Sequence, residues 1–181
     1  MSSTNDIHNT VYASLFAALI AVGAFIAIPV GPVPIVLQNF FVLLAGLTLG
    51  SRLGMVSVAV YLLAGAVGLP VFAGATGGIG RILGPTGGYL LGYLPAVWVT
   101  GFIAGREGKK WHRDAAAAVC GSLIVYACGV PWLKGITGMT WGASLGVGML
   151  PFLAGDAAKV AAAVWVIRVV RPVFRSVAQP T

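Results

Sequence analysis

Pro151-Phe-Leu-Ala-Gly-Asp-Ala-Ala-Lys-Val-Ala-Ala-Ala-Val-Trp-Val-Ile167 is a run of mostly apolar and small residues that continues to Arg171. The twenty-one residues from 151 to 171, at about 1.5 Å each, reach roughly 31 Å, which is the thickness of the hydrocarbon layer of a membrane. Pro151 suits the first turn of a helix, because its missing N–H would have no partner there. The stretch therefore predicts a membrane-spanning helix.

Two charged residues, Asp156 and Lys159, lie inside this apolar helix. Each charge near a bilayer centre costs on the order of 2.5–3.5 kcal/mol, so both need a structural or functional reason to be there. Their spacing of three residues puts them on one helix face, where they can pair, with the acid on the favourable N-terminal side. Two interpretations fit the pair: an ion pair that ties the helix to its neighbours, or a polar binding site within a membrane bundle. The second is favoured.

The composition places the whole chain in a membrane. Its 181 residues form one domain, 59% hydrophobic and only 8% charged, whereas about a quarter of the residues of soluble domains are charged. The net charge of +7 does not indicate nucleic-acid binding, because no basic run alternates with aromatic residues. The sequence also offers no evident nucleophile–base pair, metal-ligand cluster or phosphate loop. We therefore expect neither an enzyme nor a metal or cofactor site.

The apolar segments predict an all-α membrane protein with six transmembrane helices in the single domain 1–181. The first ten residues are a polar tail, and residues 29–34 hold three prolines that end the first helix. Residues 131–150 are ambiguous and suggest an interfacial segment with helical pieces. The expected spans are about 11–28, 35–50, 55–69, 86–105, 115–130 and 151–171.

The basic residues predict the orientation of this bundle. Six spans put both termini on one side, and a cytoplasmic N-terminus leaves only Arg81 and Lys134 outside. This arrangement follows the rule that basic loops stay in the cytoplasm, and it places Asp156 less than about two helical turns below the outer face. We therefore expect a pocket that opens to the outside. The inner residues are Arg52, Arg106, Lys109, Lys110, Arg113, Arg168, Arg171 and Arg175.

Two further features have more than one interpretation. Ala13, Ala17 and Ala21 form a stripe of small residues on the first helix, which allows either tight internal packing or docking of another membrane subunit. The glycine-rich stretch 70–84 can bring backbone N–H groups close to a ligand, act as a mobile lid, or simply be tolerated as a surface loop.

Four motifs, in order, resemble one known family. They are Val33-Pro-Ile-Val-Leu-Gln-Asn-Phe-Phe-Val-Leu-Leu-Ala-Gly46, Gly68-Leu-Pro-Val-Phe-Ala-Gly74, Gly84-Pro-Thr-Gly-Gly-Tyr-Leu-Leu-Gly-Tyr93 and Gly155-Asp-Ala-Ala-Lys159. Together they resemble the BioY biotin transporters, which are substrate-binding (S) components of energy-coupling factor vitamin importers. The resemblance extends from about Ala13 to Arg171.

The resemblance implies an S-component-like bundle in a bacterial cell membrane that binds biotin at its outer side as substrate. It also implies a transmembrane T component and two cytoplasmic ATPases as partners, with the alanine stripe as the docking face. Some members carry an asparagine in the loop between the third and fourth helices that helps to hold the ligand. This chain has no asparagine between Val71 and Pro85, which leaves two alternatives: a backbone group, Thr76 or Arg81 replaces that contact, or the contact is absent.

The polar groups of biotin suggest roles for individual residues. Asp156 can accept a ureido N–H, and Lys159 can donate to the ureido carbonyl or to the carboxylate; the sequence leaves both roles of Lys159 open. Arg81 is the first candidate to bind the carboxylate and Lys134 the second. Gln38 can contact the ring or the tail, while aromatic residues wall the apolar parts. The predicted biotin-binding residues are Gln38, Phe72, Arg81, Thr86, Tyr89, Asp156 and Lys159.

The sequence leaves two alternatives to this function. One is an ion-coupled carrier in which Asp156 and Lys159 relay protons. The other is a solitary, self-associating carrier of biotin or of another small vitamin. The partners in the main interpretation are biotin, membrane lipid, the T component and the ATPases.

Overall fold

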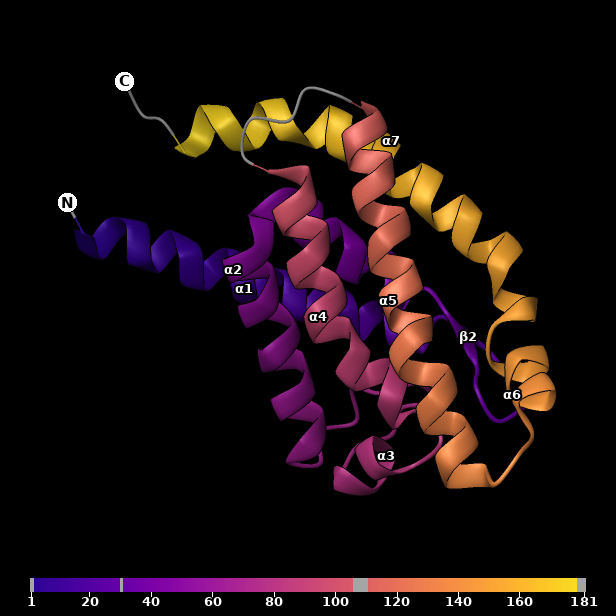
Figure 1. Cartoon of the computed structure of the whole chain (residues 1–181). Coiled ribbons are helices and arrows are strands. Elements are labelled where there is room, and N and C mark those ends of the chain that lie inside the picture. Colours follow the sequence, from indigo (N-terminus) through magenta and orange to yellow (C-terminus); the bar gives the residue numbers. More distant parts are fainter. Residues whose placement is uncertain (1, 30, 106–110, 179–181) are drawn as a thin grey trace.

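The computed structural model of the chain describes residues 2–29, 31–105 and 111–178, and the side chains of 6–29, 31–105 and 111–171 (Figure 1). It is an all-α membrane bundle with one short β-hairpin. The elements are α1 (Ser2–Phe25), β1 (Ala27–Ile28), β2 (Ile35–Val36), α2 (Gln38–Ala66), α3 (Ile79–Leu83), α4 (Gly87–Ala104), α5 (Trp111–Thr137), α6 (Trp141–Gly148), the 3-10 turn η1 (Leu150–Phe152) and α7 (Leu153–Ala178).

Five stretches of the described residues are long and apolar enough to cross a membrane: Asp6–Phe25, Gln38–Ala66, Gly87–Ala104, Trp111–Thr137 and Trp141–Arg171. Their outward faces carry large apolar side chains, such as Trp98, Phe102, Leu123 and Trp165, that are 43% to 66% exposed. A protein in water rarely leaves so much apolar surface uncovered. In a bilayer these side chains face the acyl chains.

The second of these stretches is two helical segments joined by a reversal at Gly50. Gly50 has φ 78° and ψ −177°, a conformation in the left-handed half of φ space that favours glycine. A Cβ added to Gly54 would lie 3.4 Å from the Ala45 carbonyl carbon, whereas a straight helix would separate these residues by roughly 13 Å. The chain therefore folds back on itself, and the predicted segments 35–50 and 55–69 are the two halves of α2.

Several helix boundaries differ from those of the expected spans. Helix α1 begins at Ser2, inside the expected polar tail, and ends at Phe25 rather than near residue 28, because Ala27 and Ile28 pair with Val36 and Ile35 in the hairpin. Helix α5 continues through Pro131 to Thr137, since membrane helices tolerate a proline where neighbouring groups satisfy the freed carbonyl. The expected interfacial segment 131–150 becomes the end of α5 and the short helix α6.

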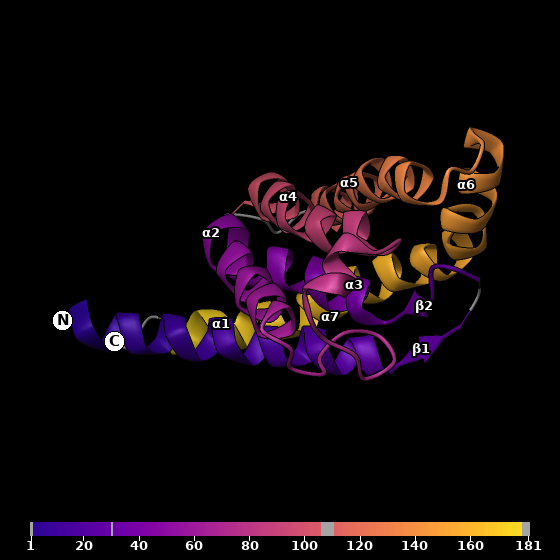
Figure 2. The ribbon, with the colours of Figure 1, turned by 90° about the horizontal axis from the view of Figure 1, so that it is seen from below.

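The bundle has two distinct ends (Figures 1 and 2). One end, called the pocket end below, carries the hairpin, the loop 67–86 with α3, and α6. The opposite end carries the Gly50 reversal, the start of α5 and the C-terminal part of α7. In Figure 2 α1 lies along one side of the molecule and α4 and α5 along the other.

Ion pairing organises the opposite end. Asp114, only 1% exposed in the first turn of α5, receives two hydrogen bonds from Arg171 of α7, at 3.0 and 2.8 Å. The Arg168 guanidinium lies 5.9 Å from the centre of the Trp111 ring. Arg168 and Arg171, expected on the cytoplasmic side, thus join α7 to α5. Of the basic residues expected on this side, Arg106, Lys109 and Lys110 lie outside the described residues, as does the side chain of Arg175.

The alanine stripe packs inside the chain. Helix α1 contacts mainly α2, and Ala13 and Ala17 are only 4% and 7% exposed, while Ala21 is half-buried. The expected docking role of Ala13 and Ala17 therefore needs correction: their small side chains let α1 approach α2 closely, which was the alternative interpretation. The same contact brings α1 against the start of α2, where a Cβ on Gly23 would lie 2.9 Å from the Gln38 Cα.

Ala17→Leu should lower the thermal stability of the purified protein in detergent, because it forces extra methylene groups into this contact and such overpacking costs about 1–3 kcal/mol. Ala18→Leu, on the exposed face of the same helix, is the matched control and should unfold at the wild-type temperature. Thermal unfolding followed by intrinsic fluorescence measures both. Equal stability of the two variants would contradict internal packing as the role of Ala17.

Candidate functional site

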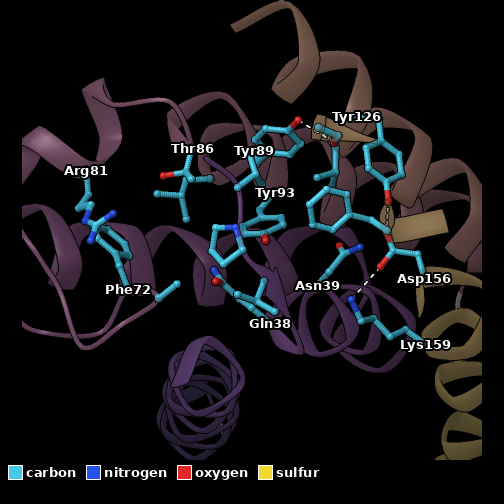
Figure 3. Close-up of a pocket in the computed structure, with 18 of the residues that line it drawn as sticks. Gln38, Asn39, Phe72, Arg81, Thr86, Tyr89, Tyr93, Tyr126, Asp156 and Lys159 are labelled. Atoms are coloured by element: carbon cyan, nitrogen blue, oxygen red, sulfur yellow. Dashed lines mark hydrogen bonds and ion pairs between the residues drawn. The ribbon is translucent and has the colours of Figure 1, made fainter. Parts of the chain in front are cut away.

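A pocket lies within the pocket end of the bundle (Figure 3). Its walls come from the segment before α2, the start of α2, the loop 67–86, α3, α4, α5, η1 and α7. The fold therefore assembles the pocket from nearly every part of the chain.

The acid–base pair of α7 forms one end of this pocket. Lys159 Nζ lies 2.8 Å from Asp156 Oδ1, and the Tyr126 hydroxyl of α5 donates a hydrogen bond to Asp156 Oδ2. The side chains of Lys159 and Asp156 are 12% and 10% exposed, and both line the pocket. The pair is therefore accessible from the pocket and is not sealed behind other side chains. Both carboxylate oxygens keep a lone pair for a further donor.

Arg81 lies at the other end of the pocket (Figure 3). It is exposed and belongs to α3, the short helix within the glycine-rich loop. Phe72 anchors that loop and is only 2% exposed. Its ring packs edge-on against the Tyr61 ring, with 5.5 Å between the ring centres, and fills the space that a side chain at Gly65 would need. Because Phe72 also lines the pocket, the anchored loop both closes one wall and holds Arg81 in place.

Tyr89 joins three elements behind the pocket wall. Its hydroxyl donates a 2.8 Å hydrogen bond to the Gly148 carbonyl at the end of α6. A Cβ on Gly129 would lie 2.3 Å from the Tyr89 ring, and one on Gly148 would lie 2.4 Å from its hydroxyl oxygen. Glycine is therefore needed at both positions to let α4, α5 and α6 meet around this side chain.

The first turn of α2 brings two buried amides to the pocket. Gln38 and Asn39 are 2% and 6% exposed and both line it. Neither Gln38 Nε2 nor Asn39 Oδ1 has a hydrogen-bond partner among the residues that the structure describes. A buried polar atom without a partner costs about 1–3 kcal/mol, so a ligand that supplies the missing partners is expected here.

All seven residues predicted from the sequence as a binding set line this one pocket: Gln38, Phe72, Arg81, Thr86, Tyr89, Asp156 and Lys159. Lys134, the second candidate for the carboxylate, is absent from the lining; its Nζ lies 5.1 Å from the centre of the Trp141 ring. Thr76, named as a replacement for the missing loop asparagine, does line the pocket.

Sequence reasoning missed three polar lining residues: Asn39, Tyr93 and Tyr126. Asn39 lies within a motif that carried the family resemblance, and an amide in an apolar helix was the available signal for it. Tyr93 and Tyr126 gave no comparable signal, since a tyrosine in an apolar segment usually packs in the core. Among the residues that the structure describes, no group of three or more His, Cys, Asp or Glu side chains could hold a metal ion.

Comparisons with known proteins agree on one family. The family model described as "BioY family" matches residues 1–176. The chain is 45% identical over 151 residues to the probable biotin transporter BioY of Pyrococcus horikoshii, covering 83% of this chain and 88% of that one. It is 42% identical over 167 residues to the biotin transporter BioY of Rhodobacter capsulatus, covering 84% and 87%.

A solved structure shares the fold. The crystal structure of the S-component for biotin from an ECF-type ABC transporter matches with a TM-score of 0.88 and 30% sequence identity, over 95% of each chain. The proteins that this chain resembles are named as transporters and as a transporter component.

Proposed function

The chain belongs to the BioY family, and from this premise we propose that it takes up biotin as the biotin-binding S component of an energy-coupling factor importer. One observation carries the proposal beyond the family: the pocket is elongated, with a guanidinium at one end and an acid–base pair at the other (Figure 3). Biotin likewise carries a carboxylate at one end and a ureido ring at the other, with apolar parts between them.

The ureido ring would bind at the Asp156 end. Asp156 accepts one ring N–H, and Lys159, held 2.8 Å from Asp156, donates to the ring carbonyl. Because Arg81 lies at the far end of the pocket, this orientation assigns the carboxylate to Arg81 and favours the ring as the partner of Lys159. A guanidinium can bind a carboxylate through two parallel hydrogen bonds.

The apolar parts of biotin would lie between these ends. Phe72, Tyr89, Leu90 and Phe152 line the pocket and are at most 7% exposed. Burying apolar ligand surface against them contributes roughly 25 cal/mol per Å² before the costs of association. Gln38 and Thr86 add polar contacts along the lining.

The proposed partners are a transmembrane T component and two cytoplasmic ATPases, in a bacterial cell membrane. The chain contains no phosphate-loop sequence of the Gly-Lys-Ser/Thr kind, so ATP hydrolysis would come from other subunits. With Ala13 and Ala17 buried inside the chain, docking through α1 would use its exposed apolar face, which includes Val11, Leu15 and Val22.

Calorimetric titration of the purified protein in detergent tests the proposal directly. Biotin should give a saturable one-site isotherm, whereas thiamine and riboflavin should give only dilution heats. A lack of biotin binding, or tighter binding of another vitamin, would contradict the proposed substrate. Co-purification of the tagged chain with T-component and ATPase subunits supports the importer; recovery of the chain alone or as an oligomer supports a solitary carrier.

A further inference from the structure

Asn39 presents to the pocket a buried acceptor that no described residue satisfies. The side chain is 6% exposed, and its Oδ1 has no hydrogen-bond partner among the described residues. In Figure 3 the Asn39 amide lies on the side of the pocket where Asp156 and Lys159 lie, and Arg81 lies on the other side. The atom therefore lies at the end of the pocket proposed for the ureido ring.

The ureido ring needs two acceptors there. Its two N–H bonds point to opposite sides of the ring carbonyl, so one carboxylate cannot accept both. Asp156 can serve one N–H, but its oxygens already accept from Lys159 and Tyr126. The hydroxyls of Tyr126 and Thr76 each have a partner already, since they donate to Asp156 and to the Ala73 carbonyl. Asn39 Oδ1 is a buried acceptor of this pocket that has no partner among the described residues.

We propose that Asn39 Oδ1 accepts the second ureido N–H and so determines the recognition of the ring together with Asp156. The proposal rests on the proposed function, because it takes biotin as the ligand.

The local fold holds Asn39 in place. Residue 39 is in the first turn of α2, directly after the hairpin, and the backbone hydrogen bond from Leu37 N–H to the Ile26 carbonyl, at 3.0 Å, fixes the entry into that helix. Close contact between Gly23 and the Gln38 backbone adds a second restraint. Because these contacts are backbone contacts, changing the Asn39 side chain leaves them intact.

Asn39→Leu separates a ligand-binding role from a structural one. Leucine has a similar size but no acceptor, so biotin affinity measured by calorimetry should fall about tenfold. In the ligand-free protein the same change removes an unpartnered buried oxygen, so the thermal midpoint should stay equal or rise. A structural role predicts a lower midpoint. Asn39→Ser, which keeps an oxygen acceptor, should lose less affinity than Asn39→Leu.

Thr48→Val is the matched control. Thr48 Oγ1 is also a buried atom of α2 that has no hydrogen-bond partner within the described part of the chain, but Thr48 does not line the pocket. The biotin affinity of this variant should equal that of the wild type. In complexes with biotin ¹⁵N-labelled in the ureido ring, both N–H protons should resonate downfield in the wild type, and one should move upfield in Asn39→Leu.

The outcomes separate the two proposals. Suppose that the wild-type protein binds biotin and that Asn39→Leu shows the same affinity and the same ureido N–H resonances. This result would overturn the role of Asn39 and leave the proposed function standing. Equal losses of biotin affinity in Asn39→Leu and Thr48→Val would also overturn the role of Asn39. Failure of the wild-type protein to bind biotin would overturn the proposed function itself.

Discussion

Asp156→Asn should lower biotin affinity about 100-fold, because hydrogen bonds to charged groups contribute about 1.5–3 kcal/mol each. The amide keeps one acceptor oxygen but loses the charge that strengthens the bond to the ureido N–H. It also leaves the Lys159 ammonium, now 2.8 Å from a carboxylate oxygen, beside a neutral group. Calorimetric titration of the purified variant with biotin measures the loss.

A second variant separates ligand recognition from bracing of the bundle. Removing one partner of a buried ion pair destabilises a protein by about 3–5 kcal/mol, much of it from the charge left behind. The double change Asp156→Asn with Lys159→Met removes that charge and should recover much of the thermal stability, while biotin affinity stays low. If the double variant regains wild-type affinity, the pair serves only to join helices.

Apolar segment length carried most of the fold prediction. The six expected segments correspond to α1, the two halves of α2, α4, α5 and α7, because backbone groups in lipid must be satisfied within each helix. Composition predicted the ends of the helices less reliably than their existence. The polar start of α1 is helical, and Pro131 does not end α5.

Charge in an apolar helix was the strongest sequence indication of the site. Asp156 and Lys159 could be recognised from their cost in lipid alone, and the charge distribution between the two sides singled out Arg81. Tyr126 could not be recognised, since its partner Asp156 is 30 residues away in the sequence and only the fold brings them together. The alanine stripe shows the converse limit: spacing defines a helix face, but the tertiary structure decides that α2 covers it.

Arg81→Gln should lower biotin affinity about 30-fold and leave the affinity for biotin methyl ester unchanged. The guanidinium can form two charge-assisted hydrogen bonds with the ligand carboxylate, whereas the ester is neutral and cannot use that charge. The wild type should therefore prefer biotin to its ester, and the variant should lose this preference. Competition of both ligands against labelled biotin measures the two affinities.

Lys134→Gln is the matched control, because it removes a cation of the pocket end that does not line the pocket. Since Arg81 is exposed, salt should screen part of its attraction for the carboxylate. Wild-type affinity for biotin should thus fall between low and high ionic strength, and that of Arg81→Gln should change little. If Lys134→Gln instead of Arg81→Gln loses the affinity for biotin and its salt dependence, the carboxylate does not bind at Arg81. The ligand orientation proposed from the elongated pocket would then be wrong, although the ureido contacts of Asp156 could still hold.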